Sequence, residues 1–273
     1  MTLFPNSRLV YGKDDALFGA IEQQQGDKPF GAFLDAGTGM HSLRWMATLK
    51  NLGMTRFKAI TADEEMRRRV QTEADSLNMS DDGDVVIGNW FGNRLPVPVD
   101  EKYDTILADY LIGAMDGFSP YKQDQMISML SSYLNPGGKL YIVGLEPIPD
   151  YADGDGNIIC KVRQIRDACI LLAGHRCYRE YPVEWIQRQV TNIPELTLLN
   201  TTTFPILYSH QTIVNQINVG RSKFESFPSP ELAEEMKKVL DDLERQSLAA
   251  TSNKKRVKLG FDYVVTAVKA EST

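Results

Sequence analysis

Between residues 31 and 146 the chain alternates short β-rich runs with helical patterns, and this alternation limits its possible folds more than any other feature. A buried apolar run at residues 32–36 ends in a glycine turn, and further β-rich runs lie at 57–62, 84–88, 104–109 and 139–145. Apolar side chains recur at helical spacing over 42–52, 63–77 and 120–134. This order of elements indicates a parallel sheet joined by helical crossovers.

The chain leaves this alternation after residue 146. Residues 147–195 contain a polar loop, a helix near 161–173 and a second helix that begins near Pro182. Long insertions after the strands of a parallel sheet commonly shape the ligand site, so we expect this segment to act as a cap. The Asn-Pro-Gly-Gly sequence at 135–138 is expected to break the chain before the fifth strand begins at residue 139.

The C-terminal part of the chain adds two β-rich runs, at 196–204 and 257–268, with a helix expected at 230–248 between them. Residues 209–220 fit a helix or a strand. We therefore predict one doubly wound α/β domain over residues 1–273. It has a mostly parallel seven-stranded sheet, helices on both faces, an antiparallel last strand pair and a helical cap insertion. Its parts are a core at 30–146, a cap at 147–195 and a completing segment at 196–273.

Charge and cysteine content exclude several functional classes. Thirty Lys and Arg residues against thirty-six Asp and Glu give a net charge of -6, so we expect neither nucleic acid nor membrane as a partner. The first fifteen residues lack the apolar core of a signal peptide, and no apolar stretch is long enough to span a membrane. The odd number of cysteines, without a CxxC pair, indicates free thiols in a reducing compartment, so we expect a cytoplasmic protein. The cysteines and His175 match no zinc-site spacing, so we expect no metal.

The glycine turn after the first predicted strand is the most informative motif. Residues 33–39 read Phe-Leu-Asp-Ala-Gly-Thr-Gly, a buried strand that ends in D-x-G-x-G at the start of a helix. Glycines allow a tight turn and a close approach of the backbone to a ligand, and the helix N-terminus offers free N–H groups to an anion. A dinucleotide fingerprint requires a third glycine at position 42, where this chain has Ser42, so NAD is disfavoured.

Later motifs follow this turn in a recognisable order. They are ADEE at 62–65, VVIGNW at 85–90, YDTILADYL at 103–111 and LNPGGKLYIV at 134–143. With DAGTG at 35–39, they make residues 30–146 resemble the class I S-adenosylmethionine-dependent methyltransferases. The resemblance implies a seven-stranded Rossmann-like fold, S-adenosylmethionine as cofactor, S-adenosylhomocysteine as product and methyl transfer as the reaction.

The resemblance also implies which residues hold the cofactor. Asp35 and the backbone of Gly37 and Gly39 would bind the methionine portion, because its ammonium group favours a carboxylate and its carboxylate favours N–H groups. His41 and Ser42 would assist.

The ribose and adenine sites are less regular. Thr61 stands where the family usually has an acidic residue for the ribose, with Asp63 just beyond it. Asn89 would meet the adenine amino edge, and Trp90 would either cover the adenine ring or pack in the core.

The predicted fourth strand ends in Asp109 and Tyr110, which in the family lie beside the sulfonium and the methyl acceptor. Candidates for a general base are Asp109, Tyr110, Glu146 and His175, although a structural role is an alternative for each. The N/D-P-P-Y signature of enzymes that methylate bases or glutamine amides is absent, which argues against those acceptors.

Basic and aromatic side chains concentrate in the predicted cap. Arg163, Arg166, His175 and Arg176 would clamp an acceptor carboxylate if they face the pocket, and would otherwise form a solvated helix face. Tyr178, with Tyr181 and Trp185, would instead surround a cationic amine or simply pack together.

We therefore expect methylation of a small molecule, preferably one that carries a carboxylate, such as a hydroxy, amino or thioether acid. One alternative is a protein methyltransferase of the same fold. Another is a noncatalytic homologue that binds the cofactor or a partner.

Overall fold

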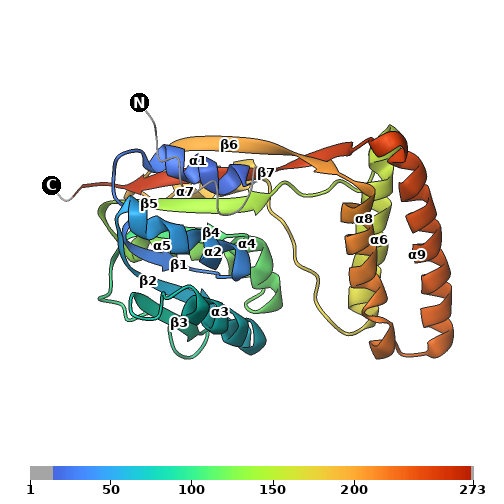
Figure 1. Ribbon diagram of the computed structural model, residues 1–273, viewed down its shortest axis with the longest axis horizontal. Helices are drawn as coiled ribbons and strands as arrows, with labels where there is room; N and C mark the ends of the chain where they lie inside the picture. The colour runs from blue at the N-terminus through green and yellow to red at the C-terminus, as the bar shows by residue number, and fades with distance from the viewer. Residues whose placement is uncertain (1–14, 272–273) are drawn as a thin grey trace. The chain divides into compact units, whose positions relative to one another are not determined.

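The computed structural model describes residues 15–271 (Figure 1). The first fourteen residues, on which the expectation of no signal peptide rests, lie outside the described residues. Seven strands form one sheet in the order β3-β2-β1-β4-β5-β7-β6. They are β1 (Gly31–Asp35), β2 (Met54–Thr61), β3 (Gly83–Ile87), β4 (Tyr103–Asp109), β5 (Leu134–Leu145), β6 (Leu196–Tyr208) and β7 (Val257–Lys269).

Strand directions confirm the predicted fold class. Strands β1 to β5 pair in parallel, whereas the β5-β7 and β7-β6 pairs are antiparallel. Strand β7, the last strand along the chain, lies between β5 and β6. Every predicted β-rich run corresponds to one of these strands.

The helices are α1 (Ala16–Gln25), α2 (Met40–Thr48), α3 (Glu64–Ser76), α4 (Leu111–Ala114), α5 (Gln123–Ser132), α6 (Asn157–Leu172), α7 (Val183–Thr191), α8 (His210–Arg221) and α9 (Pro230–Ala250). Residues 209–220, which the sequence left open, therefore form a helix capped by Ser209. Helices α1 and α4 have no counterpart among the predicted elements. Among the described residues, no helix combines the length and the apolarity that crossing a membrane requires.

The predicted break at residues 135–138 is wrong. Strand β5 already begins at Leu134, which pairs with Tyr103, and Lys139 pairs with Thr105. The four residues between them are accommodated as an irregularity within the β4-β5 pair, where Gly137 has a φ of 71°. Glycine tolerates this left-handed backbone. The Asn-Pro-Gly-Gly sequence therefore distorts strand β5 without ending it.

Helices α1, α2 and α3 share one apolar core with the sheet. Phe33, Trp45 and Val70 are fully buried there, together with Phe18 of α1. The Phe18 and Trp45 rings stack with their centroids 4.4 Å apart. Because crossovers between parallel strands are right-handed and the strand order reverses between β1 and β4, α5 lies on the opposite face of the sheet.

The chain separates into two compact units. The sheet unit contains residues up to 145, 180–204 and those from 263 onward, and the helical unit contains residues 146–179 and 205–262. In the helical unit, α6, α8 and α9 pack around a core that includes Val162, Ile217 and Leu240. The segment 147–195 expected as a cap is thus divided between the units, since α7 belongs to the sheet unit. The expected completing segment 196–273 is divided as well, because α8 and α9 belong to the helical unit.

Candidate functional site

The carboxyl ends of β1 and β4 meet where the strand order of the sheet reverses. Strand β1 pairs with β2 on one side and with β4 on the other, and Asp35 at its end pairs with Leu107 of β4. Helices leave the sheet toward opposite faces at such a point, and the crevice between them is where open α/β sheets bind ligands. The predicted residues at 35–42 and 109–110 lie at this edge.

Asp35 is the central charged group of this edge. Its side chain is 0% exposed, and its Oδ2 atom has no hydrogen-bond partner. Burial raises the pKa of Asp35 to about 6, although the hydroxyls of Ser42 and Thr38 and the backbone N–H of Gly37 oppose that rise. A buried carboxylate with an unused oxygen is costly in a folded chain, so it suits a cationic or donor group supplied from outside.

The glycine turn is fixed in shape but leaves room beside Gly39. The Thr38 N–H donates to the Ile60 carbonyl over 2.7 Å, and the Gly39 N–H donates to the Ser42 hydroxyl over 3.1 Å. A Cβ added at Gly37 would lie 2.9 Å from Leu111 Cδ1, whereas one added at Gly39 would meet nothing within 4 Å. Gly37 is therefore required by close packing, and Gly39 borders open space at the start of α2.

His41 lies in the first turn of α2 and makes an ion pair with Asp15. The His41 Nε2 atom is 3.0 Å from Asp15 Oδ2, and the Phe18 and His41 ring centroids are 4.9 Å apart. The hydrogen bond with Asp15 raises the pKa of His41 above its usual value, and burial opposes the rise. His41 thus joins the start of α1 to the start of α2.

Thr61 and Asp63 follow β2, the neighbour of β1. Thr61 is buried, and its hydroxyl accepts the Asp63 N–H over 3.3 Å. Asp63 is exposed and caps α3, because its Oδ1 atom accepts the Met66 N–H over 2.6 Å. The helix cap engages this one carboxylate oxygen of Asp63.

Asn89 and Trp90 follow β3, and both make hydrogen bonds within the chain. The Asn89 amide donates to the Phe118 carbonyl over 2.8 Å and accepts the Ser119 hydroxyl over 2.6 Å. Trp90 is 5% exposed, and its indole N–H donates to the Ala36 carbonyl over 2.7 Å. Of the two roles considered for Trp90, this geometry matches core packing.

Asp109 is the last residue of β4 and Tyr110 follows it at the start of α4, and both are half-buried. Tyr110 has a φ of 48° and a ψ of 19°, a left-handed conformation that is unfavourable for a residue with a bulky side chain. Its N–H donates to the Val143 carbonyl over 3.1 Å, which holds the strained backbone in place. Such strain concentrates at functional positions, where the surrounding structure enforces it.

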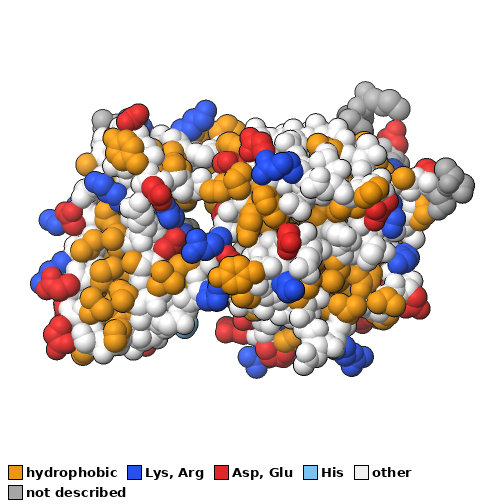
Figure 2. Space-filling model, turned by 180° about the vertical axis from the view of Figure 1, so that it is seen from behind, with side chains coloured by type: hydrophobic (Ala, Val, Ile, Leu, Met, Phe, Trp, Pro, Cys, Tyr) orange, Lys and Arg blue, Asp and Glu red, His pale blue; other side chains and the backbone are white. Residues whose placement is uncertain are grey.

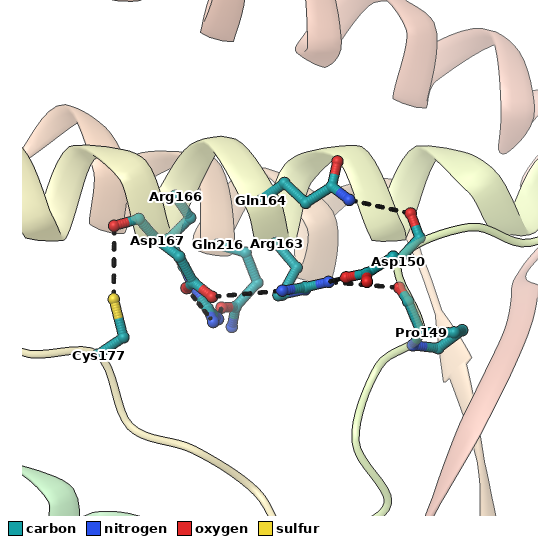
Figure 3. A network of polar contacts seen from close by, with 8 residues as sticks. All are labelled: Pro149, Asp150, Arg163, Gln164, Arg166, Asp167, Cys177 and Gln216. Carbon is teal, nitrogen blue, oxygen red and sulfur yellow. Dashed lines mark hydrogen bonds and ion pairs between the residues drawn. The ribbon is translucent and has the colours of Figure 1, made fainter.

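Arg163 and Arg166 of the helical unit make ion pairs with carboxylates of the same unit (Figure 3). Arg163 Nη2 is 2.6 Å from Asp150 Oδ1, and Arg166 contacts Asp167 at 2.7 Å and Gln216 at 2.5 Å. Arg163 also lies 3.9 Å from Asp167, while its Nε atom is buried without a hydrogen-bond partner. The structure thus brings Arg163 and Arg166 together, but with carboxylates of the chain itself.

The other predicted acceptor residues are distributed over both units. His175, Arg176 and Tyr178 are exposed in the segment that follows α6. Tyr181 and Trp185 belong to the sheet unit, where their ring centroids are 4.5 Å apart. Glu146 belongs to the helical unit, and its N–H donates to the Phe261 carbonyl over 2.9 Å.

Sequence reasoning missed residues that support the site from outside the motifs. Asp15 pairs with His41, Ser119 holds Asn89, and Leu111 packs on Gly37. A signal for Asp15 was present, since an Asp that precedes a helical pattern is a frequent helix cap, and Asp15 accepts the Phe18 N–H. Ser119 and Leu111 have no such signal because their contacts depend on the tertiary fold.

The surface of the described residues carries charges of both signs. On the face drawn in Figure 2, Lys and Arg side chains are interspersed with Asp and Glu. Within residues 15–271, no group of three or more His, Cys, Asp or Glu side chains is placed to hold a metal ion.

No protein-family model matches the chain, and no curated protein sequence matches it. Solved structures do. A candidate methyltransferase from Bacillus halodurans is similar with a TM-score of 0.60 at 12% identity, over 96% of this chain and 100% of that one. The [4+2]-cyclase SpnF gives 0.52 at 16% identity, over 89% and 74%. The mycolic acid cyclopropane synthase CmaA1, solved with S-adenosylhomocysteine, gives 0.51 at 13% identity, over 88% and 79%. The chain therefore has the fold of the class I S-adenosylmethionine-dependent methyltransferases.

Proposed function

We propose that this chain is an S-adenosylmethionine-dependent methyltransferase that acts on a small molecule and releases S-adenosylhomocysteine. The observation that carries the proposal is the unpartnered Oδ2 atom of the buried Asp35, beside a glycine turn with open space at Gly39. An α-amino acid group suits this place, because its ammonium would supply the missing partner of Asp35 and its carboxylate would be favoured by the positive end of α2. This donor set fits the methionine portion of the cofactor.

When bound, S-adenosylmethionine supplies a methyl group on a positively charged sulfur, which a nucleophilic atom of the acceptor can take. Such a displacement depends mainly on alignment and on the exclusion of water. Asp109 and Tyr110 are the proposed groups beside the acceptor, because they end the strand next to Asp35. If the acceptor must lose a proton, the half-buried Asp109 is the proposed carboxylate to accept it.

A preference for acceptors with a carboxylate stays a proposal with weakened support. It rested on the basic residues of the expected cap, and the guanidinium groups of Arg163 and Arg166 are paired with Asp150 and Asp167. A small neutral or cationic acceptor is therefore an equal candidate. A cytoplasmic location, inferred from the cysteine spacing, belongs to the same proposal.

A noncatalytic or differently catalytic protein is the second candidate, because one neighbour of the same fold is a [4+2]-cyclase. Titration of the full chain with S-adenosylhomocysteine in a calorimeter tests both. Binding in the micromolar range supports a cofactor site, and the absence of heat at millimolar ligand rejects the methyltransferase proposal.

A screen with labelled S-adenosylmethionine over small acids, amines, thioethers and protein extract then separates the candidates. Label confined to protein would overturn the small-molecule acceptor, and binding without transfer would favour the second candidate.

A further inference from the structure

We infer that Trp90 is a positioning residue for the amino-acid end of the cofactor, acting through the backbone of the glycine turn. The inference rests on the proposed function, because it concerns the same site. Its starting observation is the buried hydrogen bond of 2.7 Å from the Trp90 indole N–H to the Ala36 carbonyl. Ala36 lies between the carboxylate of Asp35 and the first glycine of the turn.

Because the peptide bond is planar, the contact with the Ala36 carbonyl also fixes the direction of the Gly37 N–H. The Ala36 carbonyl and the Gly37 N–H belong to one trans peptide unit, so they point in opposite directions and rotate together. Fixing the carbonyl toward Trp90 therefore fixes the Gly37 N–H on the other side. That N–H lies 3.4 Å from Asp35 Oδ1, which places it beside the carboxylate that would bind the ammonium group.

The remaining backbone contacts leave this peptide unit as the adjustable part of the turn. The Ala36 N–H donates to the Leu107 carbonyl over 2.8 Å, and the Thr38 N–H donates to the Ile60 carbonyl over 2.7 Å. The peptide units on either side of the 36–37 unit are thus tied to β4 and β2. Glycine has the widest backbone freedom of any residue, so without Trp90 the 36–37 unit could rotate at Gly37.

Trp90 is itself held firmly enough to act as a fixed point. Its ring contacts Tyr133 edge to face with the centroids 5.6 Å apart, and the Tyr133 hydroxyl donates to the Val97 carbonyl. The preceding residue, Asn89, is bonded to Phe118 and Ser119. The loop after β3 therefore connects the turn after β1 with the segment after α4.

This role differs measurably from a Trp90 ring that covers adenine. The Trp90 indole N–H is bonded to the backbone of the glycine turn, so its loss should act on the amino-acid end of the cofactor and spare the nucleoside. S-adenosylhomocysteine carries both parts. Methylthioadenosine carries the nucleoside and the thioether but has no amino-acid group. The ratio of the two affinities isolates the contribution of the glycine turn.

The test compares Trp90→Phe with the unmodified chain by calorimetry on both ligands. Phenylalanine keeps an aromatic ring but removes the N–H donor, so we expect S-adenosylhomocysteine to bind about tenfold more weakly and methylthioadenosine to bind within about twofold of its original affinity. Equal losses for both ligands, or a larger loss for methylthioadenosine, would overturn the inference. If the unmodified chain fails to bind S-adenosylhomocysteine, the proposed function fails instead, which is a distinct result.

Trp45→Phe provides the matched control. The Trp45 indole N–H also donates to a buried acceptor, Glu22 Oε1 at 2.8 Å, but this bond joins α2 to α1. We expect this variant to lower the melting temperature and leave the affinity ratio unchanged. If Trp90→Phe does not fold, hydrogen exchange of the Trp90 indole proton in the unmodified chain answers the same question. Slower exchange with S-adenosylhomocysteine than with methylthioadenosine supports the inference, and equal protection contradicts it.

Discussion

Asp35 of the sheet unit and the arginines Arg163 and Arg166 of the helical unit differ in whether another group of the chain balances their charge. Asp35 of the sheet unit is fully buried and keeps one carboxylate oxygen without a partner. Arg163 and Arg166 of the helical unit have side chains 24% exposed, and carboxylates of the same chain balance their charges. A buried charge without a partner in the chain indicates a place where a ligand can supply the opposite charge, whereas a charge paired within the chain stabilises the unit that contains it.

Replacing Asp35, the charge without a partner, should have the largest effect on cofactor binding. Asp35→Asn removes the carboxylate that would bind the cofactor ammonium, so we expect S-adenosylhomocysteine to bind at least about a hundredfold more weakly. The folded protein without ligand should become more stable, because a pKa raised to about 6 means that burial disfavours the charged form by roughly 3 kcal/mol. Calorimetry and thermal unfolding at pH 7.5 measure the two effects. Lower stability together with unchanged affinity would mean that Asp35 is an ordinary core residue.

The pH dependence sharpens the same contrast. A folded pKa of about 6 lies above the unfolded value, so the neutral form of Asp35 favours the folded state below about pH 4, and this contribution is lost as the pH rises through 6. The stability difference between Asp35→Asn and the unmodified chain should therefore shrink as the pH falls from 7 to 4. Ligand binding needs the ionised form, so affinity should fall about tenfold per pH unit below about 6. An affinity that stays constant down to pH 5 would contradict this assignment.

The balanced charges should give the smallest effect on ligand binding. Arg166→Gln removes the ion pair with Asp167 and the contact with Gln216, which joins α6 to α8, and we expect a loss of about 1 kcal/mol because the pair is partly exposed. S-adenosylhomocysteine affinity should change less than about twofold. Arg163→Gln should cost less still, since its partner Asp150 is 90% exposed. If either variant lost methyl transfer to acidic acceptors while it still bound the cofactor, that result would support the prediction that these arginines bind an acceptor carboxylate.

Local patterns predicted most of the fold. Strand β1, the glycine turn and α2 follow from side-chain periodicity and glycine chemistry within a few residues of one another. The break at 135–138 was wrongly predicted because Asn-Pro-Gly-Gly is normally a turn, and only the neighbouring β4 lets it remain within a strand. The division of residues 147–195 between two units could not be predicted from the sequence either, because it depends on α6 packing with α8 and α9, which come later in the chain.

The candidate site was predictable in position but not in the use of each side chain. Asp35 and Gly39 could be located from the motif alone. The engagement of the Asn89 amide with Phe118 and Ser119 depends on residues about thirty positions away, and the Trp90 contact with Ala36 spans fifty-four. The arginines of the helical unit suggested an anion site. The sequence does not show that Asp150 and Asp167 of the same chain neutralise Arg163 and Arg166.

The position of β7 between β5 and β6 has a consequence for synthesis of the chain. Within the described residues, β6 has β7 as its only neighbour in the sheet, and the thirteen residues of β6 contain no charged side chain. A ribosome that has completed β6 must still make about fifty residues before β7 begins, which takes several seconds at ordinary elongation rates. Throughout that interval an uncharged, β-prone segment lacks its native partner, so it is open to pairing with strands of other chains, and Pro205 is the one residue within it that opposes such pairing.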